Sequence, residues 1–175
     1  MADIQDAGQA RLEAAGFTRY EISAWSRPGH GARHNLNYWR FGDYLGIGAG
    51  AHGKISRVNA QGLEIERRWK TRQPGPYLER HGDPRGFIAG QRWLDRDEKG
   101  LEFLMNALRL TDGVERRLWA DHTGLDDRRL GAHTEQAIAR ELMFETTTRI
   151  QATPLGLRFL NDLLALCDDT ILARS

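Results

Sequence analysis

A change in hydrophobic period near residue 75 constrains the fold of this chain more than any other feature of its sequence. The segment LEIERRWK places Leu63, Ile65 and Trp69 on one face and charged residues on the other, as in a strand with one solvated face. After residue 96, apolar residues recur every three or four positions, which is the spacing of an amphipathic helix. This order of strands followed by helices predicts an α+β fold built from two parts.

The part before this boundary is expected to contain one helix and a few short strands. The helix runs from the N-terminus to Gly16, since glycine suits the position after a helix C-terminus. A short strand is expected at residues 17–23, and a strand at residues 44–58 forms an antiparallel hairpin with the alternating segment. We assign residues 1–75 to this unit and residues 76–95, dense in Pro, Gly and charge, to a connection with little regular structure.

Residues 96–175 are predicted to form a helical domain. The last helix is expected to begin at Pro154 with Thr153 as its N-cap. Its expected buried face is Phe159, Leu160, Leu163, Leu164 and Cys167. Before it, we expect helices at residues 98–110, 114–124 and 133–143 and a short hairpin at residues 142–153. Three helices, a hairpin and a final helix are typical of a winged-helix-like domain.

The charge of the chain argues against binding to nucleic acid. Its 25 basic and 24 acidic residues give a net charge of +1 and form no basic stripe. In the third helix, where a winged helix would place its DNA-reading residues, Glu135, Arg140 and Glu141 nearly cancel. We therefore expect the helical domain to pack internally or to dock on a partner protein.

Composition also bears on location and on metal chemistry. No apolar run approaches the roughly 20 residues that span a bilayer, and the N-terminus lacks the apolar core of a secretory signal. These features predict a cytoplasmic protein. The single cysteine, Cys167, excludes an internal disulfide and any multi-cysteine metal or iron–sulfur site made by this chain alone. Its place on the apolar side of the last helix predicts a buried structural thiol.

A stretch at residues 33–53 carries the candidate chemistry, because a polar, aromatic segment runs directly into one rich in glycine and alanine. Glycines in a strand leave room for a bulky ligand, or they let neighbouring backbone approach closely. The stretch does not complete a phosphate-binding P-loop, and the chain has no HExxH zinc motif. His34 and Asn35 are either ligand-binding residues or loop anchors, and Tyr38 and Trp39 either pack on a ligand or fill the core.

Several segments together resemble a known protein family. In chain order they are YEIS, RHNLNYWRFGDYLGIGAGAHGKI, RW, FLMNALRLTDGV and TPLGLRFLNDLL. They resemble the C-terminal half of the oxygen-independent coproporphyrinogen III oxidase-like proteins of the radical S-adenosylmethionine superfamily. Within that group, HNLNYW is similar to the HNxxYW motif of the HemW branch, the proposed heme chaperones.

The resemblance implies both a fold and a cofactor. The fold is the C-terminal remnant of a partial (β/α) TIM-like barrel, made of its last strand and a β-hairpin, followed by the winged-helix-like domain. The cofactor is heme, with His34 as candidate axial ligand to its iron, since neutral imidazole is a normal heme ligand. The other residues implied to bind or shape the cofactor site are Asn35, Tyr38, Trp39, Gly46, Gly48, Gly50 and His52.

One family feature is absent from this sequence. The CxxxCxxC motif, which holds a 4Fe–4S cluster and exposes one iron to S-adenosylmethionine in this family, does not occur here. The chain alone is therefore expected to perform no radical chemistry and to be a fragment of a longer protein.

Three functions stay open for that parent protein. The first is a HemW-like heme chaperone, which the HNxxYW motif favours. The second is an anaerobic coproporphyrinogen III dehydrogenase, which oxidatively decarboxylates its substrate, and the third is a partner-docking module. The expected partners are heme or porphyrin and a heme-recipient protein. The unpaired strand edge of a cut barrel also predicts self-association.

Overall fold

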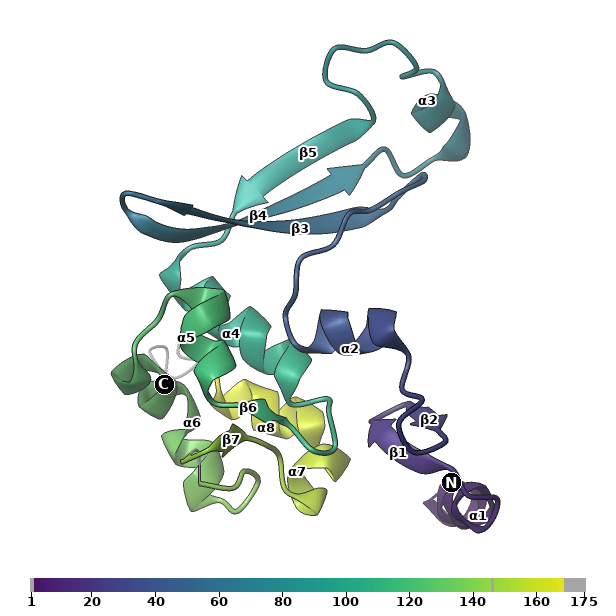
Figure 1. Ribbon diagram of the computed structural model, residues 1–175, viewed down its shortest axis with the longest axis vertical. Coiled ribbons are helices and arrows are strands. Elements are labelled where there is room, and N and C mark those ends of the chain that lie inside the picture. The colour runs from purple at the N-terminus through teal and green to yellow at the C-terminus, as the bar shows by residue number, and fades with distance from the viewer. Residues whose placement is uncertain (1, 146, 169–175) are drawn as a thin grey trace.

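The computed structural model describes residues 2–145 and 147–168. Its first elements are helix α1 (Ala2–Ala14), the antiparallel strands β1 (Thr18–Glu21) and β2 (Ala24–Ser26), and helix α2 (Arg33–Trp39). As predicted, α1 ends just before Gly16, which has a φ of +79°. This helix lies at the periphery of the molecule (Figure 1), and Ile4 is 79% exposed. The N-terminal helix therefore adds little to the core.

A three-stranded antiparallel sheet extends away from the helices (Figure 1). Its strands are β3 (His52–Asn59), β4 (Gly62–Lys70) and β5 (Ile88–Trp93), in the order β3-β4-β5, with helix α3 (Pro74–Leu78) between the last two. The predicted hairpin is confirmed, because β3 and β4 pair in continuous register from His52–Trp69 to Asn59–Gly62. The β1–β2 pair is a separate sheet.

The sheet differs from the sequence prediction in two places. The strand expected from residue 44 begins only at His52, since the chain turns through Gly48 and Gly50, both with positive φ. Before these glycines, Tyr44 makes a single bridge to Lys54. Residues 76–95, expected to have little regular structure, contain most of α3 and all of β5. The segment IAGQRW lacks the apolar alternation that would have revealed β5, because most of its residues are exposed.

The remaining elements form a helical body. They are α4 (Arg96–Ala107), β6 (Val114–Glu115), α5 (Arg117–Thr123), α6 (Asp127–Ala139), β7 (Arg149–Ile150), α7 (Pro154–Arg158) and α8 (Leu160–Leu166). Local sequence explains several boundaries. Asp95 and Glu98 form a capping box at the start of α4, and Gly124 ends α5 in the left-handed conformation. Thr153 caps α7 by accepting a hydrogen bond from the Gly156 N–H, as predicted.

Other features of the helical body correct the sequence prediction. The third helix begins at Asp127 and ends at Ala139, rather than spanning residues 133–143. Instead of a hairpin within residues 142–153, β7 pairs with β6, although a bridge joins Met143 to Ala152. The tip of the expected hairpin includes residue 146, which lies outside the described residues. The last helix is interrupted at Phe159, whose side chain is 48% exposed rather than buried.

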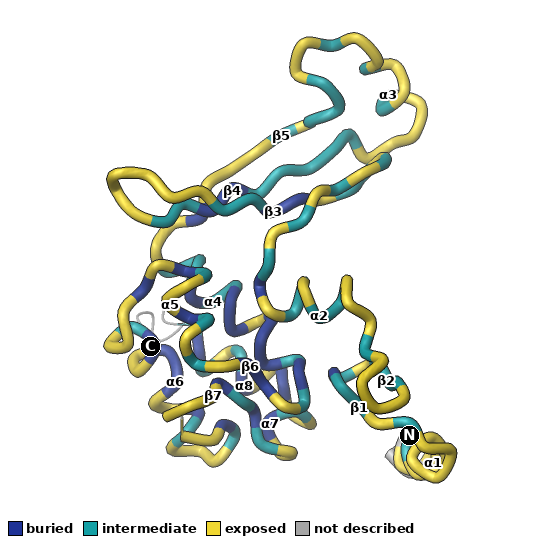
Figure 2. The backbone as a smooth tube through the Cα atoms, viewed as in Figure 1, coloured by how far each residue is buried: buried dark blue, intermediate teal, exposed yellow. Residues whose placement is uncertain are grey.

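The core lies among α4, α5, α6 and α8, where Figure 2 shows most of the buried backbone. Phe103 and Trp119 are fully buried and pack edge to face, with ring centroids 5.6 Å apart. Phe41, which follows α2, and Ile65, in β4, belong to the same core, so both the α2 segment and the sheet are anchored to the helical body. Cys167 is buried, as predicted. Within the described ranges, no helix is long and apolar enough to cross a membrane.

Candidate functional site

The HNLNYW segment forms the short helix α2, which lies between the β1–β2 pair and the helical body (Figure 1). Its first residues face different surroundings. His34 is exposed, and its side chain makes no hydrogen bond or ion pair with any other described residue. Asn35 is half-buried, and its Nδ2 donates a hydrogen bond to the Tyr20 hydroxyl at 3.1 Å. The helix is thus tied to β1 on one side while the imidazole of His34 stays free.

The aromatic end of the segment is packed against the protein. The Tyr38 ring lies 4.9 Å from that of Trp39 and 5.0 Å from that of Tyr44. The Arg109 guanidinium lies 4.4 Å from the centroid of the Trp39 ring and pairs with the buried Glu21 carboxylate at 3.3 Å. Trp39 is therefore a contact between α2 and the segment after α4, and its indole N–H is buried without a hydrogen-bond partner among the described residues.

Phe41 turns the chain from α2 toward the sheet. It adopts a φ of +60°, and its side chain is buried. Its carbonyl oxygen accepts hydrogen bonds from Lys54 Nζ at 2.9 Å and from His122 Nδ1 at 3.1 Å. A single carbonyl therefore joins the end of α2 to both β3 and α5.

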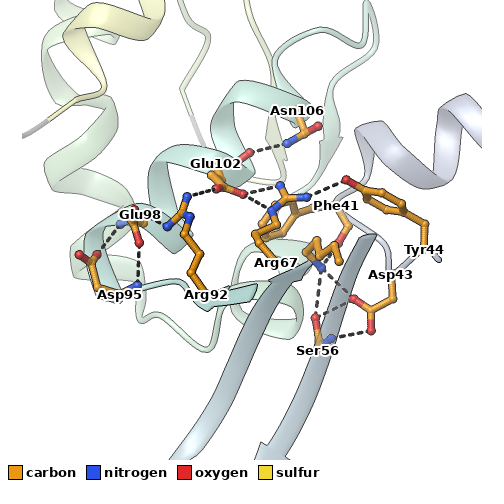
Figure 3. A network of polar contacts seen from close by, with 11 residues as sticks. Phe41, Asp43, Tyr44, Ser56, Arg67, Arg92, Asp95, Glu98, Glu102 and Asn106 are labelled. Atoms are coloured by element: carbon orange, nitrogen blue, oxygen red, sulfur yellow. Dashed lines mark hydrogen bonds and ion pairs between the residues drawn. The ribbon is translucent and has the colours of Figure 1, made fainter. Parts of the chain in front are cut away.

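Lys54 is buried and lies at the centre of a polar cluster, and Figure 3 shows its partners Phe41, Asp43 and Ser56. Its Nζ donates to Asp43 Oδ1 at 2.9 Å and to Ser56 Oγ at 3.1 Å, and lies 4.2 Å from the Phe41 ring centroid. Burial lowers the pKa of Lys54, and the nearby Asp43 carboxylate opposes that shift. Burial also acts to raise the pKa of Asp43, but hydrogen bonds from the Ser56 N–H and the Lys54 ammonium hold it below its usual value. Both groups are thus held as an ion pair.

A second cluster connects the sheet to α4. Arg67 donates from Nε to Glu102 Oε2 at 2.8 Å and from Nη1 to the Tyr44 hydroxyl at 2.7 Å (Figure 3). Burial, together with the neighbouring Tyr38, raises the pKa of Tyr44 to about 12. The phenol therefore stays neutral and accepts a hydrogen bond. With the Lys54 cluster, this contact fixes the first part of the segment between α2 and β3, at Phe41, Asp43 and Tyr44.

Sequence reasoning missed these charged anchors. It placed the charged residues of β4 on a solvated face, yet Glu66 is 1% exposed and pairs with Arg57 and Arg68. Arg67 shares a face with the apolar residues of the strand, and a charge interrupting an apolar face was the available signal for a partner across the interface. Lys54 carried no such signal, because its partners come from the turn after α2.

The structure corrects the predicted strand at the glycine-rich segment, while a cofactor-binding role for its glycines stays a prediction. The strand expected at residues 44–58 included Gly46, Gly48 and Gly50, but the observed strand β3 does not, and these glycines lie in the irregular segment before it. A Cβ at Gly46 would lie 2.2 Å from the His52 carbonyl oxygen, so this glycine serves close approach of the chain's own backbone. Gly48 and Gly50 have φ of +100° and +69°, which suits glycine in a turn. The pocket beside Gly46 measures only about 60 Å³, and His52 is exposed at the start of β3.

Comparisons with known proteins agree on a relationship. Residues 94–159 match the family described as the HemN C-terminal domain. Over 94% of its length the chain is 39% identical to the heme chaperone HemW of Escherichia coli, and it is 38% identical to HemW of Haemophilus influenzae. The chain is homologous to the C-terminal region of the HemW heme chaperones. It spans about two fifths of the length of these HemW relatives, covering 41% of each.

A solved structure shares the fold of this HemW-related chain. It is described as coproporphyrinogen III oxidase (HemN) from Escherichia coli, a radical SAM enzyme, and it aligns over 95% of this chain and 40% of its own, with a TM-score of 0.64. At 14% sequence identity this likeness concerns the fold alone. Within the described residues, no group of three or more His, Cys, Asp or Glu side chains could hold a metal ion.

Proposed function

We propose that this chain is part of a HemW-like heme-binding chaperone and that His34 provides the axial ligand to the heme iron. The observation that carries the proposal is the free, exposed imidazole of His34 on α2, within the HNLNYW segment of a chain homologous to heme chaperones. A histidine that served only to anchor the helix would have hydrogen-bond partners in the protein, as Asn35 does.

The residues around His34 fit a heme ligand. Tyr38 lies one helical turn after His34 on α2, and aromatic rings can pack on a porphyrin face. Asn35 and Trp39 hold the helix in place through Tyr20 and Arg109. In this proposal they position the site without contacting the ligand. When bound, heme would supply an iron centre that the His34 imidazole would hold.

Other parts of the predicted site receive less support. Gly46, Gly48 and Gly50 have roles in backbone geometry, and their segment offers little enclosed volume. His52 is exposed and remains a second candidate ligand. The experiment below therefore includes it.

The 4Fe–4S cluster and S-adenosylmethionine belong to the longer protein in this proposal. With one cysteine, these 175 residues lack the CxxxCxxC ligands that the cluster requires. The coproporphyrinogen III dehydrogenase alternative draws on the match of residues 94–159 to the HemN C-terminal domain and on the fold shared with HemN. The HemW relatives are much closer in sequence, which favours the chaperone.

Several finer features are part of the same proposal. In structure, the β1–β2 region and the hairpin are the C-terminal remnant of a partial TIM-like barrel, and the helical body has a winged-helix-like arrangement. In the cell, the protein is cytoplasmic, passes heme to a recipient protein and self-associates. The open edge of β5 supports self-association, since an exposed strand edge presents unpaired N–H and C=O groups.

The deciding experiment is a hemin titration of this chain, followed by the Soret band, with three histidine variants beside it. His34→Ala is expected to abolish the Soret shift and leave the far-UV circular dichroism unchanged. His30→Ala is the matched control, because His30 is also exposed and lies four residues earlier, outside α2. Binding that survives His34→Ala and is lost in His52→Ala would move the ligand to β3, and binding that is indifferent to both would refute the proposed site.

A further inference from the structure

A pocket of about 350 Å³ lies between α2 and α5, on a face of α2 that the proposed iron ligand does not occupy. Four of its lining residues are spaced at helical intervals along α2 and its C-cap, and two come from α5. They are Arg33, Leu36, Asn37, Arg40, Leu118 and His122. None of the residues lining the pocket is acidic. This concentration of donors without an internal counter-charge is what a bound anion would require.

The two arginines are not used by the fold. Arg33 and Arg40 are exposed, and neither guanidinium group makes a hydrogen bond or an ion pair with any other described residue. Arg40 contributes only weakly to the lowered pKa of Glu115, whose carboxylate is held mainly by Arg117 at 2.5 Å. Guanidinium groups left without partners are available to bind carboxylate oxygens in a bidentate manner.

The polar groups between the arginines have fixed orientations. Asn37 Nδ2 donates to the Asp43 carbonyl at 3.0 Å. His122 Nδ1 donates to the Phe41 carbonyl at 3.1 Å, which leaves Nε2 as an acceptor in the neutral ring and as a donor in the imidazolium. Leu36 and Leu118 supply apolar surface in the same pocket. The pocket therefore combines an apolar lining with cations at its two ends.

The spacing along α2 matches a ligand with more than one carboxylate. Arg33 and Arg40 are seven positions apart, which is about two turns and roughly 10 Å along a helix, on one face. His34 follows Arg33 and is turned about 100° around the helix axis from it. A flat ligand lying across the exposed side of α2 would therefore meet His34 with its centre and the arginines with its edge.

We propose that this pocket binds the propionate carboxylates of a porphyrin, with Arg33 and Arg40 as their ligands. This inference rests on the proposed heme-binding function, because a porphyrin has an apolar ring edged by two propionates. It assigns the binding of the propionates to the arginines and the coordination of the iron to His34. The two contributions can be separated by removing either the iron or the carboxylate charges from the ligand.

The test uses metal-free mesoporphyrin IX and its dimethyl ester as probes of the whole 175-residue chain, with binding followed by porphyrin fluorescence. The double variant Arg33→Gln/Arg40→Gln is expected to weaken mesoporphyrin IX binding by about tenfold or more, since each charge-assisted contact is strong. The dimethyl ester should bind the unmodified chain as weakly as mesoporphyrin IX binds the double variant. Arg128→Gln, at an exposed arginine on α6, is the matched control and should bind normally.

The outcomes separate this inference from the proposed function. Equal binding of acid and ester, or equal binding by the double variant and the unmodified chain, overturns the propionate site. If hemin coordination then still depends on His34, the proposed function stands without it. If mesoporphyrin IX binding needs the arginines while hemin coordination is indifferent to His34, the propionate site stands and the proposed iron ligand falls.

Discussion

Replacing Lys54 with methionine tests whether the buried ion pair holds the α2 segment on the sheet. The change keeps the length and most of the volume of the side chain, but it removes three hydrogen bonds, to the Phe41 carbonyl, Asp43 and Ser56. Hydrogen bonds to a charged group contribute about 1.5–3 kcal/mol each when they are lost singly. The loss of stability in Lys54→Met is expected to be smaller than the sum of these three contributions, because the variant has no ammonium group to desolvate on folding.

The structure sets the size of the remaining effect. The Asp43 side chain is 45% exposed, so water can solvate its carboxylate once Lys54 is gone. The Phe41 carbonyl keeps its hydrogen bond from His122. We therefore expect Lys54→Met to lower the free energy of unfolding by about 2 kcal/mol, which is less than the 3–5 kcal/mol typical of a fully buried pair.

Urea unfolding followed by circular dichroism measures this difference, with the slope of the transition expected to stay unchanged. Lys70→Met is the matched control, because Lys70 is in the same sheet and its side chain makes no hydrogen bond or ion pair with the described residues. It should change stability by less than about 0.5 kcal/mol. A Lys54→Met protein as stable as the original, or more stable, would refute the view that this ion pair anchors the segment.

Two further predictions concern the same segment. Gly46→Ala should lower the free energy of unfolding by about 1–3 kcal/mol, because the new Cβ would lie 2.2 Å from the His52 carbonyl oxygen. Gly131→Ala, in an exposed helical position with open space around it, should instead raise the free energy of unfolding by about 0.5–1 kcal/mol. Thermal melts compare the two variants, and a Gly46→Ala protein as stable as the original would contradict the close packing. Asp43 has a pKa held below its usual value of 3.8, despite partial burial, by hydrogen bonds that include one from Lys54. Its contribution to stability is therefore present above about pH 4 and is lost as the pH falls through the depressed folded-state pKa. Acid titrations of stability should show this loss in the original protein and not in Asp43→Asn, and parallel curves would count against the ion pair.

The elements that could be predicted from the sequence are those specified by neighbouring residues. The β3–β4 hairpin follows from the alternation in LEIERRWK, and the start of α7 follows from Thr153 and Pro154. The end of α5 follows from Gly124. In each case the signal lies within a few residues of the structure that it specifies, so tertiary contacts reinforce the local preference.

The errors fall where the structure depends on distant contacts. The strand expected from residue 44 was cut short because backbone packing at Gly46 and two turn glycines redirect the chain before β3. The pairing of β6 with β7 joins segments about 35 residues apart, and their sequence contains no local sign of that pairing. The exposure of Phe159 likewise results from the break between α7 and α8.

For the candidate site, the sequence alone was enough to single out HNLNYW and His34, because a motif is a property of consecutive residues. Only the tertiary structure decided that His34 is free while Trp39 packs beneath Arg109, which lies 70 positions away in the chain. Only it brought Arg33 and Arg40 to the same pocket as His122 of α5. The physical reason is that the burial of a side chain and the partners of a charge depend on which segments meet in space, and that is settled by the packing of the whole core.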